Sequence, residues 1–313
     1  MDRRPVTDFL TFEDLDRVAA AYDEAVRIGA SIDRFCSASF WILPAARFLS
    51  PYASPRILAE DGSYAVLARS AGWLHPLEAM WGLSCPLVGP AGVELFIRAL
   101  ELKPDWSAAL ATGIAEGSPP WRKLGRRYAA ERGPTTRRYV ADLERGVEGF
   151  LERRPSGLRK SLLKAQKRAE RLGVTFEIAD RAEGGFERLL EVERRSWKGL
   201  RGVGIDREPM RSFYWDMSRR LLERGARRLT FARLEDEDVA YIFGGVFAST
   251  YRGLQFSFDA RFSSLSLGNL SQLEEVRRLS AAGVGRYDLG SEVRYKQKWG
   301  EEVVETGSLV IRR

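Results

Sequence analysis

The fold of this chain is decided by residues 251–300, YRGLQFSFDARFSSLSLGNLSQLEEVRRLSAAGVGRYDLGSEVRYKQKWG. The first nine are typical of a β-strand, residues 260–267 of an irregular loop, and Gly268-Asn269 of a helix start. Apolar residues at helical spacing mark one face of that helix: Leu270, Leu273, Val276 and Leu279. A short strand at residues 286–289 follows. A strand that enters a helix through a glycine-containing loop presents backbone N–H groups to which an anion can bind.

The segment after the second strand, residues 290–300 (GSEVRYKQKWG), holds a carboxylate, a phenol, ammonium groups and an indole. Such a density of functional groups just past a strand end suits an acyl- or phosphoryl-transfer site, and it equally suits an ordinary charged surface loop. The chain has one histidine, His75. Catalysis would therefore use carboxylates, lysine, tyrosine, cysteine or backbone groups, and a multi-histidine metal site is excluded.

Composition favours a globular protein of about two domains, with 313 residues of which 44% are hydrophobic. No apolar run approaches the roughly 20 residues that cross a bilayer. The segment MDRRP (residues 1–5) lacks the apolar core of a signal peptide. Two cysteines, Cys36 and Cys85, give neither a disulfide framework nor a metal-binding spacing. We therefore expect a cytoplasmic protein without membrane insertion and without a bound metal.

Positive charge is concentrated in one predicted helix. Residues 152–171 hold eight lysines or arginines and two glutamates, which nearly accounts for the net charge of +7 of the whole chain. A polyanionic ligand is one interpretation: a nucleic acid, a cofactor diphosphate or a nucleotide-linked substrate. The other interpretation is an ordinary solvated helix face.

Helices and strands alternate along the chain, which predicts an α/β (α+β) architecture. In the first half we expect helices at residues 11–29, 92–102 and 119–132, a helix start at 34–41, strands at 56–58, 64–68, 106–112 and 137–143, and a packed loop at 73–90. In the second half we expect helices at residues 158–172, 186–197 and 209–224, and strands at 174–178, 228–234 and 239–247. Because Arg154-Pro155-Ser156-Gly157 breaks the pattern, we place a domain boundary there, between residues 1–154 and 155–313.

The second half resembles the CelD/Fem-type branch of the GNAT acyltransferase superfamily. The resemblance rests on GLRKS (157–161), RSWKG (195–199), Asp259 followed by LGNL (267–270), YDLG (287–290) and YKQKWG (295–300). It covers about half of the chain, and the YKQKWG ending is its most specific part. It implies a GNAT-like mixed sheet flanked by helices. By analogy with the Fem ligases, which pair two such domains, the first half would be a degenerate GNAT-like domain in tandem.

The resemblance also implies an activity, N-acyl transfer, in which an amine attacks a thioester or aminoacyl ester at the splayed centre of the sheet. The donor would be an acyl-CoA, such as acetyl-CoA, or an aminoacyl-tRNA. GNAT proteins hold the cofactor diphosphate with a Gln/Arg-x-x-Gly-x-Gly/Ala loop, whereas SLSLGN (264–269) has one glycine. Fem-type ligases also lack the full pattern and use aminoacyl-tRNA, so both donors stay open. The acceptor would be a small-molecule amine or one related to peptidoglycan or polysaccharide.

Five residues are candidates for catalysis. Lys296 resembles the lysine of the Fem ending and would stabilise charge near the reacting carbonyl or a phosphate. Glu292, Asp288 and Asp259 are candidate bases or amine anchors, and Tyr295 could protonate the leaving group. Asp288 could equally be a structural residue at a strand end.

Candidate donor-binding residues lie in two places along the chain: Ser266, Gly268, Asn269, Arg159 and Lys160. Two other classes of function stay open beside the enzyme. One is a catalytically silent GNAT-like module that binds RNA or a protein partner. The other is a structural scaffold in a polysaccharide or secondary-metabolite pathway.

Overall fold

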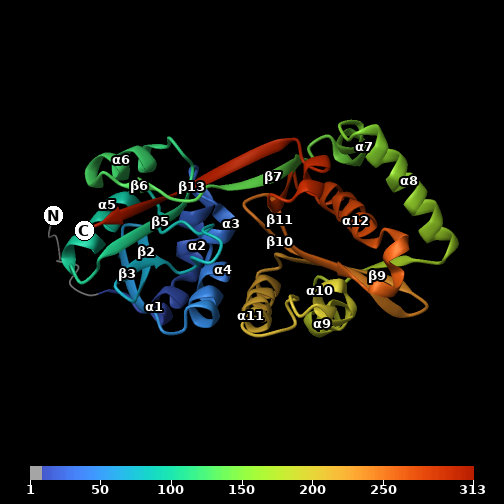
Figure 1. Ribbon diagram of the computed structural model, residues 1–313, viewed down its shortest axis with the longest axis horizontal. Helices are drawn as coiled ribbons and strands as arrows, with labels where there is room; N and C mark the ends of the chain where they lie inside the picture. The colour runs from blue at the N-terminus through green and yellow to red at the C-terminus, as the bar shows by residue number, and fades with distance from the viewer. Residues whose placement is uncertain (1–8) are drawn as a thin grey trace. The chain divides into compact units, whose positions relative to one another are not determined.

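The structure is a computed structural model that describes residues 9–313, so the MDRRP segment lies outside the described residues. It divides into two compact units (Figure 1). Unit 1 contains the described residues up to Arg137 together with Glu305–Arg313, and unit 2 contains Arg138–Val304. This division differs from the predicted boundary at residues 154/155. The physical reason is that Arg154 is buried and hydrogen-bonded to the Phe150 carbonyl and to Glu301, so the apparent break lies within a packed unit.

Unit 1 is a mixed sheet flanked by helices. Its helical elements are α1 (Phe12–Arg17), α2 (Ala19–Ile28), α3 (Arg34–Ser37), α4 (Ser39–Pro44), η1 (Ala45–Leu49), α5 (Gly92–Leu102) and α6 (Pro119–Tyr128). Its strands are β1 (Ser54–Glu60), β2 (Ser63–Ser70), β3 (Trp73–Pro76), β4 (Leu87–Val88), β5 (Ala108–Ile114), β6 (Glu131–Arg132) and most of β13 (Glu302–Arg312). The sheet order is β1-β2-β3-β5-β13. Only β3 and β5 run parallel along this order.

Three predictions for unit 1 were wrong in detail. The helix expected at residues 11–29 is two helices, because Val18 leaves the helical conformation (φ −100°, ψ 15°). The expected loop at residues 73–90 contains β3 and β4. Helix α6 ends at Tyr128 rather than at residue 132, since Ala129 adopts a left-handed conformation that stops the helix.

Unit 2 is also a mixed sheet flanked by helices. Its helical elements are α7 (Gly146–Glu152), α8 (Ser156–Arg171), α9 (Gly185–Arg195), α10 (Trp197–Leu200), α11 (Met210–Glu223), η2 (Ala260–Leu265), α12 (Leu267–Ala281) and η3 (Arg294–Lys298). Its strands are β7 (Thr136–Asp142), β8 (Thr175–Ile178), β9 (Arg227–Leu234), β10 (Glu237–Phe247), β11 (Thr250–Phe258) and β12 (Arg286–Ser291). They lie in the order β7-β12-β11-β10-β9-β8, and only β11 and β12 are parallel.

The helices of unit 2 cover both faces of this sheet. Figure 1 shows α7, α8 and α12 on one face and α9, α10 and α11 on the other. Helix α12 packs on β9, β10 and β11 through the apolar face predicted from the sequence, and Leu270, Leu273, Val276 and Leu279 are all buried. In α8 the basic side chains are exposed as expected, and Leu158, Leu162, Ala165 and Ala169 are buried. Leu172 was expected to face inward and is instead exposed.

The predicted fold class, a GNAT-like mixed sheet flanked by helices, is confirmed. Both units contain a parallel strand pair connected through a helix: β3 and β5 through α5, and β11 and β12 through α12. In each unit an antiparallel strand continues the sheet beyond that pair, β13 on β5 and β7 on β12. This recurrence favours a degenerate GNAT-like origin for unit 1, which stays a prediction.

Candidate active site

The two central strands of unit 2 separate at a defined point. Residues Thr250–Arg252 of β11 pair in parallel with residues Arg286–Asp288 of β12. Within the described residues this ladder ends at the Arg252–Asp288 pair. Beyond this pair β11 stays bonded to β10, with a bulge that leaves Leu254 without a partner on β10. A bulge and a separation at adjacent positions expose backbone groups of β11 to a ligand.

A pocket of about 310 Å³ lies where the strands separate. Residues 253–258 of β11 form one wall, and Leu289, Val293 and Tyr295 contribute another. Its lining is largely aromatic and aliphatic, and its two lysines come from different elements, Lys198 from α10 and Lys296 from η3. Such a lining suits an apolar group next to a few directed polar ones.

Lys296 lines this pocket as expected of a catalytic lysine. Its Nζ donates a 2.9 Å hydrogen bond to the Ser291 carbonyl. Burial lowers the pKa of Lys296 to about 8; the Asp288 carboxylate opposes this effect and Arg252 adds to it. Gly290 has φ +78°, and a Cβ atom there would lie 3.5 Å from Lys296 Nζ. A side chain at Gly290 would therefore be strained by the left-handed backbone and would lie in van der Waals contact with the amine.

Tyr295, the predicted proton donor, also lines the pocket. Its ring packs edge-on against Phe256, with 6.0 Å between the ring centroids. Burial raises the pKa of Tyr295 to about 12, so the phenol keeps its proton at neutral pH. It can therefore give a proton to a leaving group that becomes more basic than itself.

Glu292 and Asp288 lie close to the pocket in sequence but do not line it. Glu292 is exposed and accepts a 2.9 Å hydrogen bond from the Tyr139 hydroxyl. Asp288 is buried, accepts a 2.8 Å hydrogen bond from the Gly290 N–H, and pairs with Arg252. Burial alone would raise the pKa of Asp288, but Arg252 and Arg138 hold it below its usual value. This geometry supports the structural alternative raised for Asp288.

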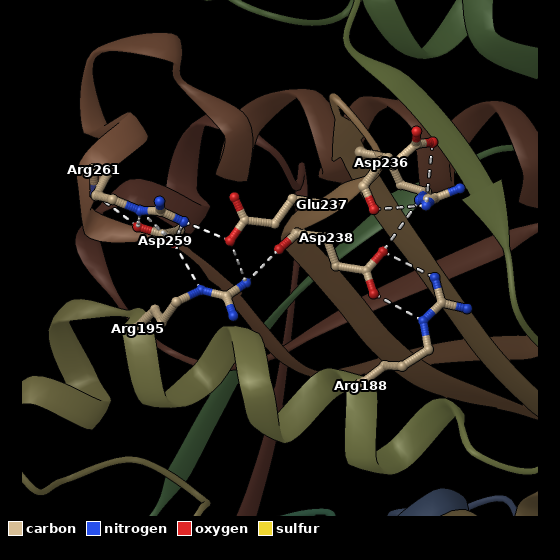
Figure 2. A network of polar contacts seen from close by, with 8 residues as sticks. Arg188, Arg195, Asp236, Glu237, Asp238, Asp259 and Arg261 are labelled. Carbon is tan, nitrogen blue, oxygen red and sulfur yellow. Dashed lines mark hydrogen bonds and ion pairs between the residues drawn. The ribbon is translucent and has the colours of Figure 1, made fainter.

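Asp259 belongs to a separate ionic network, shown in Figure 2. Its carboxylate lies 2.8 Å from Arg195 Nε and 2.7 Å from Arg261 Nη2, and the residue is 1% exposed. Burial alone would raise the pKa of Asp259, but the hydrogen bonds from Arg261 and Arg195 lower it. The carboxylate also caps η2 by accepting from the Arg261 N–H. The structure thus brings Lys296 and Tyr295 together in the pocket and leaves Asp259 outside its lining.

The same network connects α9 to the start of β10 and to β8. Arg188 binds Asp238, and Arg195 donates a 2.7 Å hydrogen bond to the Asp238 carbonyl (Figure 2). Arg188 also binds Glu177. The backbone of Asp259 also forms a bridge with Ser196, the residue that precedes α10. These contacts fix α10 and the loop before α12 relative to the sheet of unit 2.

The predicted donor-binding loop lies at the N-terminus of α12. Ser266 is left-handed (φ +58°), and its carbonyl accepts hydrogen bonds of 3.0 and 3.2 Å from the N–H groups of Asn269 and Leu270. A Cβ atom on Gly268 would lie 2.9 Å from Phe256, a residue of the pocket lining. Glycine is therefore needed at 268 for helix α12 to pack closely on β11.

The basic helix α8 lies beside this loop. Arg168 Nη1 donates a 3.3 Å hydrogen bond to the Ser264 carbonyl. Arg159 and Lys160 are exposed near the other end of α8, roughly 13 Å along the helix from Arg168 at 1.5 Å per residue. The basic face of α8 thus contacts the loop through Arg168, a residue to which the sequence analysis gave no role.

Lys198 is the principal site residue that received no role from the sequence, although it lies in the RSWKG motif. Its Nζ donates hydrogen bonds of 3.1 Å to Gln255 Oε1 and to the Phe256 carbonyl, and it lies 3.3 Å from Glu193 Oε1. Gln255 in turn donates to the Tyr214 hydroxyl. Burial lowers the pKa of Lys198, and Glu193 opposes this effect. The sequence signal that could have found it is the RSWKG motif (195–199), which contains this lysine.

Further chemistry is limited within residues 9–313. No group of three or more His, Cys, Asp or Glu side chains in this range is placed to hold a metal ion. Cys36 and Cys85 are buried free thiols. None of the helices in the same range is both long and apolar enough to cross a membrane.

A parallel strand pair that separates around a pocket, with a helix connecting its strands, defines unit 2 as a GNAT-type fold. Residues 156–297 match the family model of the acetyltransferase (GNAT) domain. The resemblance to the GNAT superfamily that the sequence predicted is therefore confirmed over these residues. A sequence comparison with curated proteins gives no significant match.

Solved structures extend the likeness over both units. The crystal structure of FemX aligns with a TM-score of 0.68 at 13% identity, covering 92% of this chain and 95% of FemX. The structure of L-PGS from Bacillus licheniformis aligns with a TM-score of 0.62 at 12% identity, covering 98% of this chain and 94% of L-PGS. At these identities the likeness shows a shared fold, which is the fold that the Fem-type resemblance predicted.

Proposed function

We propose that this protein is an N-acyltransferase that works in the pocket between β11 and β12. It would transfer an acyl group, acetyl or aminoacyl, from an acyl-CoA or an aminoacyl-tRNA to an amine acceptor. The observation that carries the proposal is the position of Lys296 and Tyr295, which line one pocket at the separation of the two strands within a GNAT domain. A cytoplasmic location, where both donors occur, goes with this proposal.

In the proposed reaction the acceptor nitrogen attacks the donor carbonyl carbon, and a C–N bond forms. The carbonyl oxygen becomes an oxyanion, which the ammonium group of Lys296 stabilises. The C–S or C–O bond to the donor then breaks. The Tyr295 phenol gives its proton to a leaving ribose alkoxide and recovers one from the acceptor nitrogen. A leaving CoA thiolate is a weaker base than this phenol and takes the proton of the acceptor nitrogen, so protons balance with either donor. No nucleophilic side chain is required.

The nature of the donor is the open part of the proposal. The GNAT domain match supports an acyl-CoA. The basic face of α8, adjacent to the loop before α12, supports a polyanion, and the Fem-type resemblance makes aminoacyl-tRNA the candidate. Both donors carry phosphate groups that lysine and arginine can bind. The acceptor would be a small-molecule amine or an amine of a peptidoglycan- or polysaccharide-related molecule.

A second candidate function is a catalytically silent GNAT-like module that binds RNA or a protein partner. It is favoured by the single glycine in the SLSLGN segment and by the exposed basic face of α8. Such a module would need the basic face but would not need Lys296. An apolar pocket with a partly buried lysine favours the enzyme.

A thermal-shift panel separates the two functions. The ligands are acetyl-CoA, longer acyl-CoAs, free CoA, aminoacyl-tRNA and deacylated tRNA. A ligand of the native state stabilises it by RT ln(1 + [L]/Kd), about 2.7 kcal/mol at a hundredfold excess over Kd. The proposal predicts that one acylated donor raises Tm more than its deacylated form. Equal shifts by acylated and deacylated tRNA would support the silent module, and no shift by either donor class would contradict the acyltransferase.

A further inference from the structure

A buried ion pair marks the point where β11 and β12 separate. Arg252 and Asp288 are register partners and form the last pair of the described β11–β12 ladder. Arg252 Nη2 lies 3.1 Å from Asp288 Oδ2, and both residues are buried. Arg138 of β7 approaches the same carboxylate oxygen to 3.4 Å. Two guanidinium groups thus share this one carboxylate beside the pocket.

This pair is connected to Lys296 by a short path. Asp288 Oδ1 accepts a hydrogen bond from the Gly290 N–H. The Lys296 amine lies beside Gly290, since a Cβ atom on Gly290 would be 3.5 Å from Lys296 Nζ. Asp288 and Arg252 are the charged residues whose fields act on the Lys296 amine, with opposite signs. Neither residue lines the pocket, so any effect on the reaction must pass through another group.

We propose that Arg252 and Asp288 are positioning residues that, together with the burial of the amine, set how much of Lys296 carries a positive charge. This inference rests on the proposed function, because it assigns the charge of Lys296 to oxyanion stabilisation. The carboxylate favours the ammonium form, and the guanidinium favours the neutral amine. Because the two charged residues are register partners on adjacent strands, the pairing of β11 with β12 fixes their positions relative to each other.

Other charged groups around Lys296 have their own partners. Lys198 of α10 lines the same pocket and is paired with Glu193. Tyr295, the preceding residue, remains a neutral phenol at neutral pH. Glu292 accepts from Tyr139 and is exposed to solvent, where its field is screened. We therefore expect substitutions in the Arg252–Asp288 pair to change the protonation of Lys296 more than substitutions of these other groups.

The test is a titration of Lys296 itself and needs no substrate. Trace labelling with fluorodinitrobenzene between pH 6.5 and 11, read by peptide mass spectrometry, gives the pH at which half of Lys296 reacts. Arg252→Met should raise this pH by roughly one unit, and Asp288→Asn should lower it by a similar amount, as expected for removal of a neighbouring charge. Exposed Lys298 in the same protein is the internal reference.

Arg286→Gln is the matched control, because it removes one positive charge from β12 at an exposed pair with Glu302. It should leave the titration of Lys296 unchanged. Arg252→Gln provides a milder variant should Arg252→Met fail to fold, as judged by circular dichroism. An unchanged half-labelling pH in a folded Arg252 variant would overturn the inference, as would equal shifts of Lys296 and Lys298. Absence of acyl transfer would instead count against the proposed function and leave the titration result intact.

Discussion

Lys198 Nζ lies 3.3 Å from Glu193 Oε1, and this ion pair connects the end of α9 to the wall of the pocket. Glu193 is fully buried and also accepts from the Tyr241 hydroxyl at 2.9 Å. Lys198 in turn holds the Phe256 carbonyl of β11. The two pocket lysines therefore differ in kind, since Lys198 is paired with a carboxylate whereas Lys296 hydrogen-bonds to a backbone carbonyl.

We expect Lys198→Met to destabilise the protein strongly. It leaves Glu193 buried without its cation, and breaking a buried pair in this way costs about 3–5 kcal/mol. The free energy of unfolding, measured with urea, should fall accordingly. Lys296→Met should lower it by only about 1 kcal/mol, because it removes one hydrogen bond to a backbone carbonyl and no ion pair. Equal losses for the two variants would contradict the division of roles.

We expect the basic face of α8 to bind the donor. Arg159→Glu combined with Lys160→Glu should weaken donor binding, and the loss should shrink at high salt, where ions already compete for the phosphates. Binding is measured by fluorescence titration over a salt series. The matched control is Arg122→Glu with Arg126→Glu, which makes the same charge change on exposed residues of α6 in unit 1. Equal weakening by both pairs would indicate a general charge effect rather than a site.

We expect Gly268→Ala to narrow the pocket. The added methyl group would lie 2.9 Å from Phe256, which must move because such a contact is too close. Donor affinity should then fall by several-fold, and Tm should fall by a few degrees, as for other overpacked sites. Asn269→Ala is the comparison at the next position. A drop in Tm with unchanged donor affinity would mean that Gly268 serves only the fold.

We expect activity to decline as the pH rises through about 8. Lys296 is charged below its pKa of about 8 and neutral above it. Since the charged form is proposed to stabilise the oxyanion, kcat should fall up to tenfold per pH unit above that value. Lys296→Arg, whose guanidinium keeps its charge, should flatten the profile. A rate that rises through pH 8 would assign Lys296 to the neutral, proton-accepting form.

Much of this architecture could be predicted because local patterns specify it. The apolar spacing of Leu270, Leu273, Val276 and Leu279 identified α12, and the strands before and after it were found within two residues of their ends. Lys296 and Tyr295, which line the pocket, became candidates because their motif lies just past a predicted strand end. In each case the pattern on which the prediction rests lies within a short stretch of sequence.

The rest depends on partners far apart in the chain. Asp259 was a candidate base until the structure placed Arg195, 64 residues away, against its carboxylate. Lys198 gains its role from Gln255, 57 residues on. The unit boundary differs from the prediction because β13 returns to unit 1 to pair with β5. No local pattern shows which charge a buried side chain will meet.

The most direct test of the acyltransferase account is single-turnover acyl transfer followed by mass spectrometry. It compares the parent protein, Lys296→Met and Lys298→Met, using a donor that stabilises the protein and a panel of amines. Lys298 lies in the same turn, is exposed and does not line the pocket. The account predicts a loss of roughly a hundredfold or more for Lys296→Met and near-parental transfer for Lys298→Met. Full activity in both variants, or damage confined to Lys298→Met, would contradict it.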